Sequence, residues 1–469
     1  MKSKDLIKAG IPPGPALKEA RRAAARAGRA KLGRRVIAET MARVAAGPED
    51  YREDPIFGAL AALLLAEKEK EESRPPSFTP RREPAPWRKW GDQIEPQSIG
   101  QMERACNLPV AHRGALMPDA HLGYGLPIGG VLAVREAVIP YAVGVDIACR
   151  MKLTVLDLPT RVLTKEQDRL RRVLERETRF GLGATFRKRR RHPVLDEEWG
   201  VTEVTRGLKD RAWSQLGTSG SGNHFVEFGE LETWDESLGL PAGRHTALLS
   251  HSGSRAAGNA VATHFSRLAA RLRPELPREL RHLAWLDLDS EEGRDYWAAM
   301  SLMGRYAAAN HQLIHRHIAR GLGAEVLLDL ENHHNFAWRE VHDGKELVVH
   351  RKGATPAGQG VLGIIPGSMA TPAYIVRGRG EPASLDSASH GAGRVMSRKR
   401  AKATFTWSEA RRRLAAAGVT LISADLDEVP MVYKDIEKVM AAQRDLVEIL
   451  ARFHPRLVKM APPGHRAED

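Results

Sequence analysis

The stretch GVDIACRM, residues 144–151, places an aspartate and a cysteine three positions apart, directly after an apolar segment. Cys149 is one of only two cysteines in the chain, the other being Cys106. Thiolate and carboxylate groups are ligands of transition metals, and a thiolate can bridge two ions. The spacing of Asp146 and Cys149 therefore indicates a metal site. A small buried cysteine with a purely structural role is the alternative.

Five further stretches each place histidine, in one case with aspartate, at an expected strand end or glycine turn, where a side chain can point into a cleft. They are MPDAHLGYGLPIGG (117–130), LGTSGSGNHFVEFGE (216–230), LLSHSGSRAAGN (248–259), NHHNFAW (332–338) and SASHGAGRVMSRKRA (387–401). A single histidine beside a glycine is more often an ordinary loop residue than a ligand. Several histidines together with an aspartate and a cysteine supply the ligand types that Mn, Zn, Fe or Co prefer.

The glycines around Asn223 and His390 also suit phosphate binding, because they let backbone N–H groups approach phosphate oxygens closely. Neighbouring Asn, Ser, Arg and Lys side chains add further donors. The chain contains no GxxxxGK[ST] loop and no KxDG motif. An ordinary P-loop NTPase and a ligase with a nucleotidylated lysine are therefore both disfavoured.

The elements that must position these residues are short β-branched runs mixed with longer amphipathic helices, which predicts an α+β fold. The stretch 131–147 suggests strands, and helical periodicity extends over 163–178, 256–272, 293–322 and 435–453. No internal repeat is visible. The basic loop FRKRRRHP (186–193) contains five consecutive cations. Cations are costly to bury, so we expect this loop to be exposed.

The N-terminal region differs in composition from the rest of the chain. Residues 1–46 hold twelve Lys or Arg and three acidic residues, and the Ala-rich stretch 16–46 predicts a basic helix. A second helical stretch, 54–72, ends before a proline-rich linker, which places a domain boundary near residue 86. The basic helix could contact nucleic acid directly. Because no aromatic residue is interleaved with its cations, a solvated or partner-packing face is at least as good an interpretation.

Length and charge limit the class of protein. A chain of 469 residues accommodates one large domain and an appendage. Its net charge of +14 favours polyanions such as RNA, DNA or an acidic membrane surface, although a generally basic proteome would explain it as well. The two cysteines, the absence of an apolar leader in MKSKDLIKAGIPPGP and the absence of any apolar run near ~20 residues predict a cytoplasmic protein without a membrane partner.

The six stretches, in this order, resemble the RtcB family of RNA ligases, also called tRNA-splicing ligases. The resemblance runs from Trp87 to Lys459 and includes LGTxGxGNHFxE, SHSGSR, RKGA (351–354), IPGSM (365–369), SxSHGAGR and VYKDI (432–436). It implies an α+β, RtcB-like catalytic domain over residues 87–469, with a central cleft for metal and nucleotide. Residues 1–86 would be a basic, mainly helical extension outside the family core.

The resemblance also implies a reaction. A GTP- and Mn-dependent RNA ligase would join an RNA 3′-phosphate, or a 2′,3′-cyclic phosphate after hydrolysis, to a 5′-hydroxyl in RNA repair or tRNA splicing. His390 would attack the α-phosphate of GTP, GMP would pass to the RNA 3′-phosphate, and the 5′-hydroxyl would displace it. Neutral imidazole is nucleophilic at physiological pH, which suits this relay. Two Mn²⁺ ions would share Cys149, one also bound by Asp146 and His224 and the other by His251 and His334.

By the same resemblance, eight residues would bind the nucleotide: Asn223, Glu227, Asn335, Ser368, Gly391, Gly393, Tyr433 and Lys459. The two asparagines would contact phosphates, Glu227 would accept from the guanine edge, and Tyr433 and Lys459 would contact the base. Glu227 and Asn335 could instead hold the neighbouring histidine ligands in place. Tyr433 could be a core residue. Family members tend to end near a Lys-Gly pair, whereas here nine residues follow Met460.

Three positions depart from the family pattern near the chemistry. Ala148 and Arg150 stand where many members have glycine, so a backbone that requires positive φ would be strained there. Arg150 could add a cation that faces the phosphates. Pro356 replaces a common arginine, which would remove one RNA or phosphate contact.

Two other functions remain alternatives to a ligase. One is a metal-dependent cyclic phosphodiesterase or phosphatase that acts on RNA ends and ligates weakly. The other is a basic RNA-binding protein with a decayed site. Retention of His390 and of all five expected metal ligands argues against the decayed site. The sequence leaves open whether an activating protein partner is required and which RNA or DNA end is the natural substrate.

Overall fold

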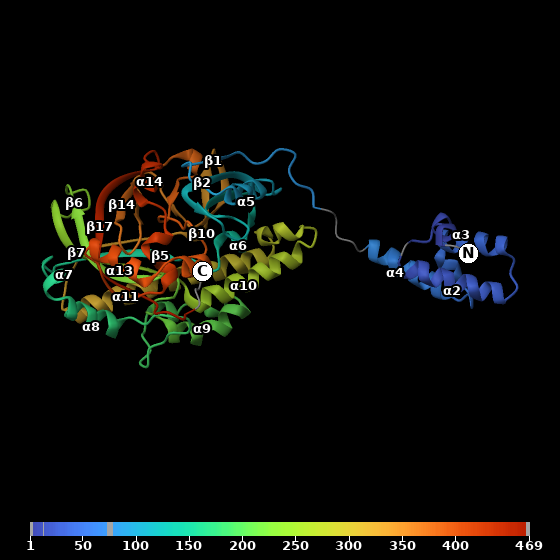
Figure 1. Ribbon diagram of the computed structural model, residues 1–469, viewed down its shortest axis with the longest axis horizontal. Helices are drawn as coiled ribbons and strands as arrows, with labels where there is room; N and C mark the ends of the chain where they lie inside the picture. The colour runs from blue at the N-terminus through green and yellow to red at the C-terminus, as the bar shows by residue number, and fades with distance from the viewer. Residues whose placement is uncertain (1–2, 13, 73–77, 466–469) are drawn as a thin grey trace. The chain divides into compact units, whose positions relative to one another are not determined.

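The computed structural model of the chain describes residues 3–12, 14–72 and 78–465, and Figure 1 traces its helices and strands. The chain divides into two compact units, Met1–Ser77 and Phe78–Asp469. Helices and strands are mixed along the second unit, which confirms the α+β fold class. None of the helices within the described ranges combines the length and apolar character that a membrane span requires.

The break between the units precedes the boundary near residue 86 that the prolines suggested. Residues that follow the break are already hydrogen-bonded to the second unit: the N–H of Arg81 donates to the carbonyl of Asn107, and that of Ala85 to the carbonyl of Cys106. The proline-rich stretch from residue 78 onward is therefore part of the second unit, although it has little regular structure.

The described residues of the first unit form four α-helices, α1 Ser3–Lys8, α2 Pro15–Arg29, α3 Arg34–Ala46 and α4 Gly58–Glu72, and a short 3-10 helix, Pro48–Tyr51. Ala16, Ala20, Ala23 and Ala27 recur at helical spacing on α2, and all four are buried in a core that belongs to this unit alone. The cations of α2 lie mostly on the opposite, exposed face. The unit therefore has a hydrophobic core of its own beneath a basic surface.

The basic stretch 16–46, expected as a helix, is two helices. Lys31 adopts a left-handed backbone conformation with φ 61°. The N–H of Leu32 donates to the carbonyl of Ala27 at 3.1 Å, which closes the end of α2 in the usual manner of a left-handed cap. Helix propensity alone did not reveal this break.

The second unit is built on an eight-stranded sheet with the order β13-β14-β17-β6-β7-β5-β9, in which β16 lies beside β17. Only β16 runs parallel to its neighbour. The strands are β5 Arg150–Leu156, β6 Phe225–Thr233, β7 Gly243–Ser252, β9 Val326–His333, β13 Leu362–Ile365, β14 Ala373–Gly378, β16 Thr420–Ser423 and β17 Val447–Met460.

Side chains of this sheet alternate between two cores. Helices α8 (Gln167–Glu177) and α11 (Glu291–Leu322) cover the face that carries Phe228 and Leu248, and Figure 1 shows both helices on one side of the strands. On the other face the sheet curls, so that its edge strands β9 and β13 approach each other. The N–H of Ile364 donates to the side-chain oxygen of Asn332 at 3.1 Å across this gap.

A second sheet of five strands has the order β1-β2-β3-β11-β10, and two smaller pairs are β4-β8 and β12-β15. Their bounds are β1 Trp87–Lys89, β2 Ala111–His121, β3 Ile128–Val134, β4 Ala137–Val138, β8 Leu286–Asp287, β10 Asn335–His342, β11 Lys345–Lys352, β12 Ala354–Pro356 and β15 Ser387–Ser389. The remaining α-helices are α5 Pro96–Cys106, α6 Pro140–Val143, α7 Val162–Lys165, α9 Glu203–Gln215, α10 Arg255–Leu272, α12 Arg398–Thr404, α13 Trp407–Ala416 and α14 Ile436–Ala441.

Three of the four helices expected in this unit are confirmed as α8, α10 and α11. The fourth expectation, a helix over 435–453, is wrong beyond Ala441. Residues from Val447 onward form β17, which pairs with β14 on one side and β6 on the other. Pairing along both edges, between partners distant in the sequence, overrides the local helical periodicity.

The five consecutive cations of the basic loop 186–193 are exposed as expected, except for one. Arg190 is only 8% exposed. Its guanidinium lies 3.8 Å from the ring centre of Phe186, and it donates to the carboxylate of Glu177 at 3.0 Å and to the carbonyl of Gly217 at 3.2 Å. Pairing offsets the cost of burying this one cation. It fastens the loop to the segment that leads to Asn223.

Candidate active site

Four of the five expected metal ligands lie where strands of the large sheet begin or end. Cys149 directly precedes β5, His224 directly precedes β6, His251 is the penultimate residue of β7, and His334 directly follows β9. The strands are neighbours in the order β6-β7-β5-β9, and their register brings these strand ends to the same end of the sheet. The sheet therefore brings together side chains that are up to 185 positions apart in the sequence.

The five side chains form two groups that share one cysteine. Cys149, His251 and His334 make the first group, and Asp146, Cys149 and His224 make the second; all are buried. The Sγ of Cys149 lies 3.1 Å from Nε2 of His251 and 3.4 Å from Nε2 of His224. Nε2 of His251 lies 3.2 Å from Nε2 of His334, and Nε2 of His224 lies 3.1 Å from the carboxylate of Asp146.

Hydrogen bonds and burial determine which groups of this cluster carry protons. The Nδ1 of His251 lies 3.1 Å from the carbonyl of Asn223, so Nδ1 carries the proton and Nε2 presents a lone pair to the cluster. Burial lowers the pKa of His251 to about 3 and that of His334 well below its ordinary value. Burial raises the pKa of Asp146, but its interactions with His224 outweigh burial and hold that pKa below the usual range.

The loop between Asp146 and Cys149 requires unusual backbone geometry. Ala148 is fully buried and has φ 55°, which is the left-handed region, and its N–H donates to the carbonyl of Asn335 at 2.6 Å. A position that favours glycine is thus occupied by alanine, with the strain expected from the sequence. Gly253 lies against this loop, where an added Cβ would meet the carboxylate of Asp146 at 2.1 Å.

Arg150 does not face the phosphates, and that expectation is wrong. Its side chain is 5% exposed and points to the helical side of the sheet. The guanidinium donates to the carboxylate of Glu331 at 2.9 Å and to the carbonyl of Gly304, on α11, at 3.2 Å. As the first residue of β5, Arg150 directs its side chain to the face opposite the neighbouring Cys149.

The adjacent histidines at the end of β9, His333 and His334, have different surroundings. His334 is in the cluster, with its ring centre 5.0 Å from that of His390. His333 instead packs against two aromatic rings, 5.2 Å from Phe336 and 5.0 Å from Trp338. The structure therefore brings His334, and not His333, to the other candidate ligands.

His390 is held by a residue that the sequence analysis did not single out. The carboxylate of Asp119 lies 2.7 Å from Nδ1 of His390 and also accepts the backbone N–H of His390 at 3.2 Å. Asp119 is fully buried in β2, within the stretch MPDAHLGYGLPIGG. The Nζ of Lys434 donates to the carbonyls of Pro118 and Ala120 at 3.1 and 2.7 Å, and so fastens the backbone on both sides of Asp119.

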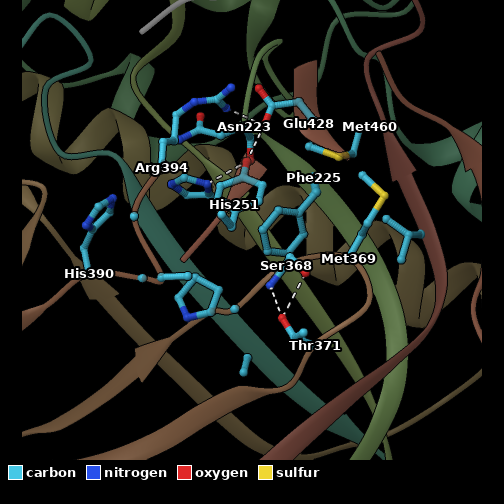
Figure 2. Close-up of a pocket in the computed structure, with 18 of the residues that line it drawn as sticks. Asn223, Phe225, His251, Ser368, Met369, Thr371, His390, Arg394, Glu428 and Met460 are labelled. Carbon is cyan, nitrogen blue, oxygen red and sulfur yellow. Dashed lines mark hydrogen bonds and ion pairs between the residues drawn. The ribbon is translucent and has the colours of Figure 1, made fainter. Parts of the chain in front are cut away.

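A pocket with about 820 Å³ of empty space, its open mouth included, adjoins His390 and His251. In Figure 2 the polar side chains of His390 and Arg394 lie on one side and the apolar side chains of Met369 and Met460 on the other. Six of the eight expected nucleotide-binding residues line this pocket: Asn223, Glu227, Ser368, Gly391, Gly393 and Tyr433.

Gly393 is required by the backbone that surrounds His390. Its φ of 75° favours glycine, and an added Cβ would come within 2.0 Å of the carbonyl oxygen of Asp119. The loop after His390 therefore packs directly on the strand that holds the histidine. Ser368 shapes the opposite wall, because its hydroxyl and backbone N–H both contact the hydroxyl of Thr371, at 2.9 and 2.7 Å.

Two acidic residues of the pocket have contrasting environments. Glu227 is 4% exposed, and burial raises its pKa well above the ordinary value. Glu428 is ion-paired with Arg394 at 3.3 Å and accepts a hydrogen bond from the hydroxyl of Tyr433. Tyr433 thus combines a role in the pocket wall with a contact to Glu428. Arg394 is a cation of the pocket that the sequence analysis did not propose, although it ends the motif SxSHGAGR.

Asn335 and Lys459 lie outside the set of pocket-lining residues. The amide of Asn335 links two loops of the site, donating to the carbonyl of Asp146 at 3.3 Å and accepting from the N–H of Gly353 at 2.8 Å. Lys459 lies between two pocket-lining residues of β17, so its side chain points to the other face of the sheet.

The surroundings of Lys459 are helical. Its Nζ donates to the hydroxyl of Thr178 at 3.0 Å, and burial lowers its pKa to about 8. The structure thus does not bring Lys459 to the pocket as a base contact.

Pro356, the third position that departs from the family pattern, pairs with Ser387 on β15, the strand that leads directly to His390.

Comparisons with known proteins agree with this arrangement. The family described as tRNA-splicing ligase RtcB matches residues 101–460. The chain is similar to RNA-splicing ligase RtcB1 of Escherichia coli strain ATCC 25922, with 36% identity over 404 residues that cover 78% of this chain and 95% of the relative. It is also similar to the tRNA-splicing ligase RtcB of Nanoarchaeum equitans, with 32% identity over 440 residues that cover 77% and 91% of the two chains. The chain belongs to the RtcB family.

Proposed function

We propose that the protein is a GTP- and manganese-dependent RNA ligase that joins 3′-phosphate or 2′,3′-cyclic phosphate ends to 5′-hydroxyl ends, in RNA repair or tRNA splicing. One observation carries this proposal: a histidine anchored by a buried carboxylate lies beside both a pocket and a five-residue cluster of metal-ligating side chains. Its membership of a ligase family supports the same conclusion.

The donor set fits a pair of divalent cations. Thiolate is a usual ligand of zinc, imidazole of zinc and iron, and carboxylate of manganese, so a set that holds all three ligand types accommodates these ions. The Nε2 atoms of His251 and His334 lie 3.2 Å apart in buried, neutral rings, and Cys149 belongs to both groups, so a shared thiolate can serve two ions. We assign Asp146, Cys149 and His224 to one ion and Cys149, His251 and His334 to the other. When bound, the ions neutralise phosphate charge and orient the reacting groups.

His390 is the proposed nucleophile toward GTP. Its Nδ1 faces Asp119 as an N–H donor, so Nε2 is left with the lone pair that attacks. A bond forms between Nε2 and the α-phosphorus, the bond from that phosphorus to the β-phosphate oxygen breaks, and pyrophosphate leaves. Asp119 stabilises the positive charge that develops on the ring and keeps the ring in its orientation.

The transfer to RNA follows in two further displacements. An oxygen of the RNA 3′-phosphate attacks the histidine-bound phosphorus, the N–P bond breaks, and His390 regains its lone pair. The 5′-hydroxyl then attacks the RNA 3′-phosphorus, loses its proton and releases GMP. A cyclic phosphate end must first be opened by water. Arg394 supplies a positive charge in the pocket for these anionic species.

We assign guanine recognition to Glu227 and Tyr433, and phosphate contacts to Asn223 and Ser368. Guanine offers adjacent N–H donors, and the Glu227 carboxylate buried in the pocket wall is a suitable acceptor for them. The glycines 391 and 393 let the backbone approach the nucleotide. Asn335 acts through the loop of Asp146, which it holds. Neither cysteine forms a disulfide, which suits the reducing cytoplasm in which we place the reaction.

Radiolabelled GTP distinguishes the proposal from its alternative. The full chain is incubated with manganese and GTP labelled at the α-phosphate, and covalent label on the protein is measured alongside joining of RNA ends. A ligase acquires the label and joins the ends. Opening of a cyclic phosphate without label or joining would instead establish a metal-dependent phosphodiesterase.

A further inference from the structure

A short hairpin loop rises from the wall of the pocket. It connects β2 to β3, and the residues that bound it, His121 and Ile128, are paired across the two strands and both line the pocket. Tyr124 stands in the middle of this loop with 67% of its surface exposed, the largest fraction among the Phe, Tyr and Trp side chains that the structure describes. It is three positions after His121, so the chain limits its Cα to about 10 Å from that residue.

Tyr124 belongs to a cluster of three rings. Its centre lies 6.3 Å from the ring of Tyr141, at 81°, and 5.7 Å from the ring of His282. Tyr141 and His282 are 4.6 Å apart. The Nζ of Lys352 lies 4.9 Å from the centre of Tyr141 and donates to the carbonyl of Tyr124 at 2.6 Å. The hairpin is thus fastened at its tip, and the rings are arranged before any ligand arrives.

The cluster is built on the segments that form the active site. Tyr141 is in α6, which leads into the loop of Asp146, and Lys352 is followed by Gly353, whose N–H is held by Asn335. An added Cβ on Gly353 would lie 3.2 Å from the ring of His390. A ligand on the exposed ring of Tyr124 is therefore close to the reacting groups, and the fixed segments beneath it set its position.

We infer that Tyr124 is a stacking platform for a base of the RNA, belonging to one of the few nucleotides beside the ends that are joined. A residue that served packing alone would be buried, whereas Tyr124 is 67% exposed and lies three positions from His121, which lines the pocket. Bases stack on exposed aromatic side chains in single-stranded RNA recognition, independently of base identity. This inference rests on the proposed function, because it takes RNA ends as the substrate.

Abasic RNA tests the inference. We compare kcat/KM for substrates that carry a base with those that lack it at one of the last nucleotides of the 3′-phosphate strand or of the 5′-hydroxyl strand. Wild type should prefer the base by about tenfold at one position, the worth of one base–aromatic stack. Tyr124→Ala should reduce this ratio to about one, whereas Tyr124→Phe, which keeps the ring, should preserve it. Fluorescence of 2-aminopurine at that position should be quenched by wild type and Tyr124→Phe but not by Tyr124→Ala.

Matched measurements separate the ways in which the inference could fail. Trp234→Ala removes another exposed aromatic side chain, outside the cluster, and should leave the base preference unchanged. Tyr124→Ala should still acquire the GMP label and keep its thermal midpoint, because the side chain is exposed. An unchanged base preference in Tyr124→Ala, or equal loss of activity on base-bearing and abasic RNA, would overturn the platform. Absence of the label from wild type would instead refute the proposed function.

Discussion

The carboxylate of Asp119 contacts His390 twice, at 2.7 Å from the ring nitrogen Nδ1 and at 3.2 Å from the backbone nitrogen. The backbone contact fixes the position of the residue, and the ring contact fixes its tautomer and orientation. Asp119 is fully buried, so water does not compete for either contact. The two residues are 271 positions apart, and the packing of Gly393 on the same strand keeps them together.

Asp119→Asn should slow attachment of GMP to His390 by about 10²- to 10⁴-fold, the range expected when a group that orients a catalytic imidazole loses its charge. The amide retains the size of the carboxylate, but it neither stabilises the charged ring nor enforces one tautomer. Single-turnover labelling with GTP measures the effect. Manganese content, measured by elemental analysis, should stay at the wild-type value. Labelling at the wild-type rate would show that Asp119 has only a structural role.

His390→Ala should abolish both the covalent GMP label and the sealing of a 3′-phosphate end, while metal binding persists. The substituted protein should still join an RNA whose 3′-phosphate already carries GMP, because that substrate needs only the metal cluster and attack by the 5′-hydroxyl. His251→Ala, which removes a proposed ligand, should not join it. Label on another residue of His390→Ala would disprove the nucleophile assignment. Failure on activated RNA with metals retained would show that His390 also serves the last step.

Cys149→Ala should lose bound manganese, because the thiolate belongs to both ligand groups. Cys106→Ala is the matched control: this cysteine is also buried, but it lies in α5 and burial raises its pKa to about 12. It should retain the metal and lose only about 1 kcal/mol of unfolding free energy, as expected for a small truncation in a core. Elemental analysis of both variants decides the matter, and equal metal content would exclude Cys149 as an essential ligand.

Glu227→Gln should weaken labelling by GTP by about 10- to 100-fold, the worth of one or two hydrogen bonds to a charged acceptor. The preference of this variant for GTP over ATP should also fall, because the amide no longer matches the N–H donors of guanine. Glu230→Gln is the control, because Glu230 lies on the other face of β6 and pairs with Arg244 at 3.4 Å. The ratio of labelling with GTP to labelling with ATP is measured for each. An unchanged ratio in Glu227→Gln would mean that another residue reads the base.

The motif stretches that resemble the family include the five expected metal ligands, and the structure brings those five side chains together. Six of the eight residues that the resemblance implied for the nucleotide line one pocket. Asp119 lies inside one of these stretches, 117–130, but nothing in the sequence distinguishes it there, because its role depends on its distant partner His390. The strain at Ala148 was expected from the missing glycine, and φ 55° confirms it.

Long-range strand pairing explains why some predictions from the sequence were wrong. The stretch 447–453 has helical periodicity, but β6 and β14 offer hydrogen-bond partners on both its edges. Once these residues are a strand, side chains alternate between faces, and Lys459 must point away from the pocket that Val458 and Met460 line. Arg150 is directed away from the cluster for the same reason. Because successive side chains of a strand point to opposite faces, a difference of one position decides whether a cation of these motifs reaches the site.

Deletion of residues 1–77 should weaken RNA binding and leave GMP labelling intact, because the first unit has its own core and the candidate active site lies wholly in the second. Eight cations on or between α2 and α3 are exposed and available to phosphates: Lys18, Arg21, Arg22, Arg29, Lys31, Arg34, Arg35 and Arg43. Each phosphate contact with a single strand contributes about 0.7 to the slope of log affinity against log salt. The deletion should therefore lower both the affinity at ~0.1 M salt, where screening is incomplete, and this slope.

Substitution of Lys18, Arg21, Arg22 and Arg29 by glutamine in the full chain tests the same surface without removing the unit. These side chains are exposed, so the alanine core beneath α2 should stay intact and the thermal midpoint should not change. The slope should fall part of the way toward that of the deletion. Equal affinity and equal slope in wild type, the deletion and the glutamine variant would show that the basic face does not contact RNA. Its cations would then serve only as a solvated surface, the other role that their sequence allowed.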